Sequence, residues 1–183
     1  RQPTLARLQL QAEQGDQRAQ VNLGYMYRDG LGIPQDTAKA VRWYRMAAEQ
    51  GHASAQNALG VMYQSGYGVS QDIRESVKWY RMAAEQGHAD AQIQLGLLNA
   101  NGEGVSQSYT ESAKWFRLAA NQGDASGQLN LGRLYHSGNG VSQNYVQAHM
   151  WYKLAASGSR GELREYASQS LDLVASKMTS EEI

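Results

Sequence analysis

The sequence predicts an all-α solenoid made of helix-loop-helix repeats that recur every 36 residues. Similar stretches recur at this spacing: IPQDTAKAVRWYRMAAEQG at 33–51, VSQDIRESVKWYRMAAEQG at 69–87 and VSQSYTESAKWFRLAANQG at 105–123. The tryptophans keep the same period, at Trp43, Trp79, Trp115 and Trp151. A fixed period of this size is typical of solenoids, in which each repeat packs on its neighbours.

The first helix of a repeat is clearest after Asp16, a residue type that caps helices. Ala19 and Leu23 are spaced so that they share one helical face. Gly30 and Gly32 then permit positive φ, so we expect the helix to end there.

The second helix of each repeat begins at one of four equivalent capping residues: Asp36, Asp72, Ser108 and Asn144. All four residue types can accept a hydrogen bond from a free N–H of the first helical turn. Three residues later stand Lys39, Glu75, Glu111 and Gln147. All but the lysine are expected to complete a capping box by bonding back to the capping residue.

A glycine also stands inside the first helix of every repeat, at Gly24, Gly60, Gly96 and Gly132. Glycine in a helix interior costs about 1 kcal/mol relative to alanine. Its recurrence predicts that another backbone comes close. The expected partners are the Ala-Ala pairs of the second helices, at 47–48, 83–84, 119–120 and 155–156.

The two ends of the chain are less regular. Shifted by one period, residues 1–15 resemble a second helix, which we expect to start near Pro3 and to cover the stack. Residues 160–178 place apolar side chains on one helical face and predict a closing helix. Thr179 with Glu182 begins another capping box, which favours either a continuing chain or a frayed tail.

The predicted organisation has six parts. They are a degenerate N-terminal capping helix at 1–15, repeats at 16–51, 52–87, 88–123 and 124–159, and a closing helix with the start of a further helix at 160–183.

Composition narrows the function classes. Net charge is zero, with 17 basic and 17 acidic residues, so no overall field attracts nucleic acid or an anionic membrane. There is no cysteine, which excludes a disulfide scaffold and a thiolate metal site. No apolar run approaches the roughly 18–20 residues of a membrane span. The start at Arg1 without methionine favours a processed or trimmed N-terminus and leaves a removed signal sequence open.

The pattern A-Q-x-x-L-G-x-x-Y, then G-x-G-V, then K-x-x-x-W-Y-x-x-A-A-E-Q-G strongly resembles the Sel1-like repeat family. In repeat one it is carried by Ala19, Gln20, Leu23, Gly24, Tyr27, Gly30, Gly32, Lys39, Trp43, Tyr44, Ala47, Ala48 and Gly51. The resemblance covers nearly all of residues 3–178. It implies a right-handed superhelix of α/α hairpins, related to the tetratricopeptide fold. It also implies adaptor or scaffold work in bacteria, with an exported or periplasmic location and a cytoplasmic one as the alternative.

In the tetratricopeptide relatives the first helix of each repeat lines a concave groove. Positions counted from each Leu-Gly pair correspond to the groove positions of those relatives. The apolar ones form a strip: Val21, Tyr25, Val61, Ile93, Leu97 and Leu129. Polar residues beside it could bond the backbone of a bound peptide: Asn22, Asn57, Gln94 and Asn130, with Arg133 also in the groove. The alternative is that these side chains pack between neighbouring first helices.

Other chemistries have weaker signals. The glycine loops lack GxGxxG after a strand and lack GK[ST], so they indicate helix ends rather than phosphate sites. No two histidines have the spacing of a helical zinc site, and no Ser-x-x-Lys or GxSxG is present. Basic residues on the second helices, such as Arg42 and Arg45, fit either nucleic-acid binding or a solvated outer face, and we favour the latter.

We therefore expect a non-catalytic adaptor that binds a partner protein or peptide and needs neither cofactor nor metal. Replacing Val61 and Leu97 with arginine is expected to abolish that binding. Two alternatives stay open. One is an enzyme with a cell-wall-related or β-lactam-binding activity, which a cluster of polar groups with perturbed pKa values would favour. The other is a structural spacer that self-associates through the helices at its ends.

Overall fold

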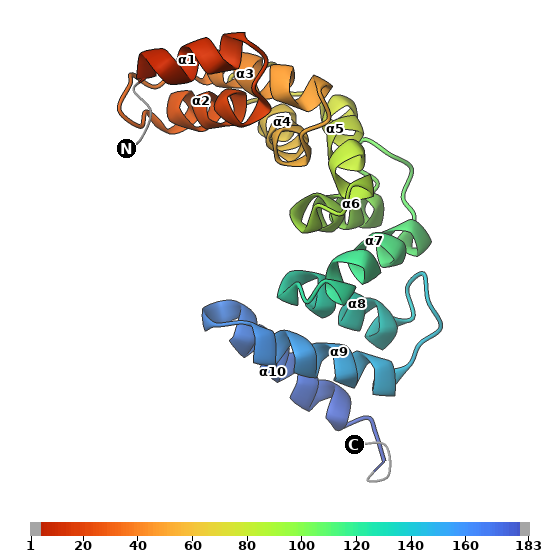
Figure 1. Ribbon diagram of the computed structural model, residues 1–183. Coiled ribbons are helices and arrows are strands. Elements are labelled where there is room, and N and C mark those ends of the chain that lie inside the picture. Colours follow the sequence, from red (N-terminus) through yellow and green to blue (C-terminus); the bar gives the residue numbers. More distant parts are fainter. Residues whose placement is uncertain (1–4, 180–183) are drawn as a thin grey trace. The chain divides into compact units, whose positions relative to one another are not determined.

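The computed structural model describes residues 5–179, which form ten helices and no strand. They are α1 (Leu5–Glu13), α2 (Gln17–Asp29), α3 (Thr37–Glu49), α4 (Ala53–Ser65), α5 (Ile73–Glu85), α6 (Ala89–Asn101), α7 (Tyr109–Asn121), α8 (Ala125–Ser137), α9 (Tyr145–Gly158) and α10 (Gly161–Ala175). This confirms the all-α helical repeat solenoid (Figure 1). The predicted start near Pro3 lies outside the described residues, and the capping box of Thr179 extends beyond them.

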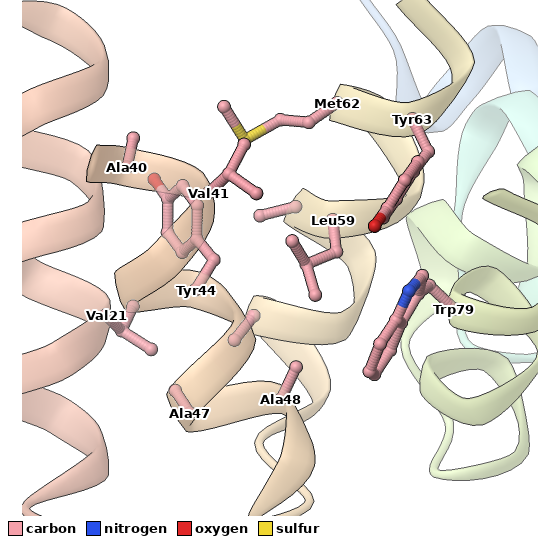
Figure 2. Packing of buried hydrophobic residues seen from close by; sticks show 12 residues of the cluster. Val21, Ala40, Val41, Tyr44, Ala47, Ala48, Leu59, Met62, Tyr63 and Trp79 are labelled. Carbon is pink, nitrogen blue, oxygen red and sulfur yellow. The ribbon is translucent and has the colours of Figure 1, made fainter. Parts of the chain in front are cut away.

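The chain divides into two compact units, Arg1–Ala91 and Gln92–Ile183. In unit 1 consecutive helices from α1 to α5 pack on one another, and in unit 2 the same holds from α7 to α10. A hydrophobic cluster in unit 1 joins α3 and α4 to Trp79 of α5 (Figure 2). In that cluster Tyr44 and Leu59 have no solvent exposure, so the core of the unit is formed between helices rather than within any one of them.

The predicted capping residues of the second helices are confirmed. Side-chain oxygens of Asp36, Asp72, Ser108 and Asn144 accept from the backbone N–H three residues on, at 2.9–3.2 Å. The capping boxes, however, are wrong. The N–H of Asp72 donates instead to the carbonyl of Tyr63, 2.9 Å away, and that of Ser108 to Asn99, 2.8 Å away. Because these bonds tie the second helix to the end of the first, the donors are already used, and Glu75 pairs with Lys78 at 2.7 Å.

The glycine inside each first helix also has an unexpected partner. A Cβ placed at Gly24, Gly60 or Gly132 would meet the ring of Tyr44, Tyr80 or Tyr152, and one at Gly96 would meet the ring of Phe116. The expectation of Ala-Ala pairs opposite these glycines is therefore wrong. The ring of the aromatic residue that follows each tryptophan packs against the glycine, and the missing Cβ makes room for it.

Buried glutamines join successive repeats. Gln20, Gln56 and Gln128 donate to the carbonyl that ends the preceding second helix, at 2.9, 3.1 and 3.4 Å. A second glutamine, at the end of the second helix of the same repeat, donates to the side-chain oxygen: Gln50 to Gln20, Gln86 to Gln56 and Gln122 to Gln92. Amide pairs at these joints meet the hydrogen-bonding needs of otherwise buried polar groups.

The last of these pairs is incomplete. The position equivalent to Gln122 is Gly158, and the side-chain oxygen of Gln128 is buried without a hydrogen-bond partner. A Cβ at Gly158 would have that oxygen as its nearest neighbour, at 4.0 Å. A glutamine there would supply the missing donor.

We therefore expect Gly158→Gln to raise the free energy of unfolding by about 1 kcal/mol more than Gly158→Ala does, the typical net value of one hydrogen bond. Urea unfolding followed by circular dichroism measures the difference. Gly158→Ala is the control, because it gains the same kind of helix propensity but lacks the side-chain amide donor. Equal stability of the two variants would contradict this account of the joint.

Candidate functional site

The structure divides the predicted groove residues into core and surface. Val21, Ile93 and Leu129 are buried, at 7–9% exposure, and each belongs to a hydrophobic cluster. Their side chains pack mainly in these clusters and present little surface to a partner. Tyr25 and Val61 are exposed at 37% and 46%, and Leu97 is partly buried.

In unit 1 the two exposed groove residues, Tyr25 and Val61, border a pocket of about 220 Å³, called here the Val61 pocket. Among the predicted residues, Tyr25, Asn57 and Val61 line it, while Asn22 is exposed and does not. The remaining lining comes from α2, α3, α4, α6 and the loops that follow α4 and α5: Arg28, Tyr44, Ser54, Ala58, Met62, Ser65, Tyr67, His88 and Asp90.

Aromatic rings shape the Val61 pocket. Tyr25 meets Tyr44 edge-to-face, with ring centroids 5.6 Å apart, and the guanidinium of Arg28 lies 4.9 Å from the Tyr25 ring centroid. Two hydrogen bonds of 2.7 Å join Arg28 to Asp29, from Nε and Nη2, which raise the pKa of Arg28 and lower that of Asp29. The charge of Arg28 is therefore balanced beside the pocket.

Tyr44 contributes a buried polar group to the same pocket. Burial raises the pKa of its hydroxyl, and that oxygen has no hydrogen-bond partner. Its equivalent one repeat later, Tyr80, donates to Gln64 at 2.8 Å. Arg28 stands at the position equivalent to Gln64, and because a guanidinium has donors but no acceptor, it offers Tyr44 no comparable partner.

Unit 2 contains a pocket at the equivalent positions, of about 280 Å³, called here the Leu97 pocket. Leu97, Asn130 and Arg133 of the predicted set line it, whereas Gln94 is half-buried elsewhere. Its other residues are Ala100, Asn101, Tyr109, Phe116, Leu134, Ser137 and Asn139. Leu97 takes the place of Tyr25, and Arg133 that of Val61, two repeats further along the chain.

A third pocket, of about 510 Å³, shares Arg133 and Ser137 with the Leu97 pocket and is called here the Tyr166 pocket. It is completed by His136, Gln143, Tyr145, Tyr152, Tyr166, Ser170, Leu173 and Lys177. Burial raises the pKa of Tyr152 to about 12, and Tyr166 adds to this, while Arg133 acts in the opposite direction. Arg133, Tyr152 and Tyr166 line this pocket together.

Sequence reasoning missed many residues that line these pockets, and two of them share one position of the repeat. Tyr67 and Asn139 each stand between two loop glycines, and both line a pocket. The signal was present in the sequence, because the residue between the glycines differs in every repeat: Leu31, Tyr67, Glu103 and Asn139. A variable residue held between fixed glycines is typical of a recognition position on a rigid frame.

The basic residues of the second helices contact the protein itself. Arg45 donates to the hydroxyl of Tyr63, and Arg117 to that of Tyr135 at 2.6 Å. Lys78 and Lys114 pair with the glutamates three residues before them. Within residues 5–179 no three metal-ligating groups gather, and no helix has the length and apolarity that crossing a bilayer requires.

Comparisons with known proteins identify the repeat. A family model described as Sel1 repeat matches residues 17–52, 53–88, 89–124 and 125–159. No curated protein matches this chain.

Two solved bacterial structures are similar over most of the chain. One is a protective antigen of uropathogenic Escherichia coli with an SLR fold, 40% identical, with a TM-score of 0.90 over 96% of this chain and 37% of that chain. The other is a Sel1 repeat protein from Oxalobacter formigenes, 40% identical, with a TM-score of 0.80 over 85% and 62%. The chain thus spans less than two thirds of either relative.

A more distant neighbour shows the fold alone. It is an immunity protein from Pseudomonas aeruginosa, 19% identical, with a TM-score of 0.54 over 92% of this chain and 72% of that chain.

Proposed function

This chain belongs to the Sel1 repeat family, and from that premise we propose that it is a non-catalytic adaptor that binds an extended segment of a partner protein. Sel1 repeat proteins are generally protein-interaction scaffolds, and their fold is typically non-catalytic. The proposal places the partner in the pockets that lie between the first helices of successive repeats. The repeat limits predicted from the sequence, with residues 1–15 and 160–183 as caps, are part of the same proposal.

One observation carries this function. The Val61 and Leu97 pockets occur at equivalent positions of the sequence, two repeats apart. Tyr44 lines the first and its equivalent Phe116 lines the second, so the same part of the repeat forms a hollow in both units. Each hollow combines apolar side chains with an amide, from Asn57 in one and Asn130 in the other. An apolar hollow beside a group that can bond a peptide backbone suits an extended peptide.

The titratable groups support the non-catalytic part of the proposal. Shifted pKa values in the described part of the chain belong to exposed ion pairs such as Arg28 with Asp29, and to the buried tyrosines Tyr44, Tyr80 and Tyr152. Burial raises the pKa of each tyrosine further above neutral pH. A general acid or base works best with a pKa near the working pH, so these shifts do not favour the enzyme alternative.

Val61→Arg is expected to reduce capture of the partner from an extract of the protein's own cells at least tenfold, because a charged side chain would fill the pocket. Val146→Arg is the matched control, since Val146 is 44% exposed, against 46% for Val61, and lines none of the three pockets. Quantitative mass spectrometry of the captured proteins measures both variants. Leu97 is a less clean test position because it packs on the cluster around Phe116.

Equal capture by Val61→Arg and the wild-type protein would contradict the placement of the partner in the Val61 pocket.

Self-association through the helices at the ends of the chain stays a separate prediction. Light scattering across a range of concentrations measures it, because a spacer that self-associates would gain mass as concentration rises.

A further inference from the structure

Arg133 of α8 occupies an unusual place in unit 2. It lines both the Leu97 pocket and the Tyr166 pocket, and its side chain is exposed. Its hydrogen bond within the described part of the chain is long, 3.5 Å from Nη1 to the side-chain oxygen of Asn130. None of the ion pairs found among residues 5–179 includes it. Arg28 in unit 1, by contrast, is neutralised by Asp29.

The surroundings of Arg133 are basic and aromatic. The described lining of its two pockets contains His136 and Lys177 but no aspartate or glutamate. Six rings complete the lining: Tyr109 and Phe116 in the Leu97 pocket, and His136, Tyr145, Tyr152 and Tyr166 in the Tyr166 pocket. The ring of His136 lies 5.8 Å from that of Tyr145 and 6.3 Å from that of Tyr152, measured between centroids.

The acidic groups nearby lie beside this patch and outside its lining. Glu103 accepts a hydrogen bond of 2.8 Å from Asn101, at the edge of the Leu97 pocket. Glu162 and Glu165 line a different hollow, which is shared with Leu129 and Tyr166. An extended polyanion such as nucleic acid would meet these carboxylates, whereas a peptide with one acidic residue among apolar ones would not.

We propose that unit 2 binds a partner segment through one carboxylate of that segment, which pairs with Arg133 while neighbouring apolar side chains fill the Leu97 and Tyr166 pockets. This rests on the proposed adaptor function and names the chemistry of its partner. A guanidinium offers two parallel N–H donors to a carboxylate, and the rings nearby offer apolar surface to the side chains beside it. The carboxylate belongs either to an acidic side chain or to a chain end.

The test uses fluorescein-labelled octapeptide pools and anisotropy with the full chain. One pool has a central glutamate among randomised Leu, Tyr, Ala and Ser residues, and a matched pool has glutamine in its place. Both are prepared with amidated ends, and the glutamine pool also with a free C-terminal carboxylate. The wild-type protein is expected to bind at least one carboxylate-bearing pool about tenfold more tightly than the amidated glutamine pool, the value of one charge-assisted hydrogen bond.

Arg133→Gln should remove this preference and leave binding of the amidated glutamine pool unchanged. Arg164→Gln is the charge-matched control, since Arg164 is an exposed residue of α10 outside both pockets. A preference retained in Arg133→Gln, or no binding by any pool, would overturn the proposal. So would a single-stranded thymidine octamer that binds through Arg133 more tightly than the peptides. Loss of partner capture in Val61→Arg would still support the adaptor function in each of these cases.

Discussion

Gly140→Ala is expected to lower the free energy of unfolding by about 3 kcal/mol, because two separate costs meet at one residue. Gly140 has a φ of +70°, in the left-handed region that L residues rarely adopt. A Cβ there would also overlap the carbonyl group of Tyr109 and lie 2.6 Å from the N of Thr110. These are backbone atoms at the start of α7, which is held by the cap of Ser108, so the overlap cannot be relieved by rotating a side chain.

Gly32→Ala isolates the conformational cost. Gly32 has a φ of +73° at the equivalent loop position, but a Cβ there would have no heavy atom within 4 Å. We expect a loss of about 1 kcal/mol, from backbone strain alone. Urea unfolding of both variants measures the difference, which is the cost of the overlap between the added methyl group and α7. Equal losses would show that this overlap is relieved without cost.

Gly60→Ala is the second large effect, with an expected loss of about 2 kcal/mol. A Cβ at Gly60 would lie 2.5 Å from Cδ1 and 2.6 Å from Cε1 of Tyr80. The ring of Tyr80 is fully buried and its hydroxyl is bonded to Gln64, so it has little room to move away. Overpacking of this kind should outweigh the gain of about 1 kcal/mol in helix propensity.

Two further variants complete this test. Gly158→Ala is the control, because a Cβ at that helical glycine would have its nearest neighbour at 4.0 Å, and it should be neutral or stabilising. Gly60→Ala combined with Tyr80→Leu should lose less stability than the sum of the two single variants, since the smaller side chain makes room for the methyl group. Additive losses, or a Gly60→Ala protein as stable as wild type, would refute the close contact.

Features that depend on neighbouring residues in the chain could be predicted from the sequence. Asp36 and Asn144 cap their helices as expected, because a cap needs only a suitable side chain three residues before a free N–H. The predicted reciprocal bond from Glu75 failed, since the N–H of Asp72 is used by Tyr63 of the preceding helix. Periodicity within one helix does not reveal such a competitor.

The candidate site shows the same limit. Helical register placed Tyr25 and Val61 on the surface of the first helices, where they border a pocket. It could not separate them from Val21, because a residue one turn away is close to the next helix and is buried by it. The pairing of Gln50 with Gln20 likewise joins residues 30 positions apart, a distance at which sequence spacing alone gives no contact.

The paired glutamines have a consequence for how such a protein changes in length. Gln56 and Gln86 form the same bonds as Gln20 and Gln50, so one joint is chemically interchangeable with the next. Duplication or excision of a gene segment that encodes one whole 36-residue unit would create no new kind of boundary. A lineage could therefore add or lose units in single genetic steps, and each unit added by duplication would bring a further joint of the same kind.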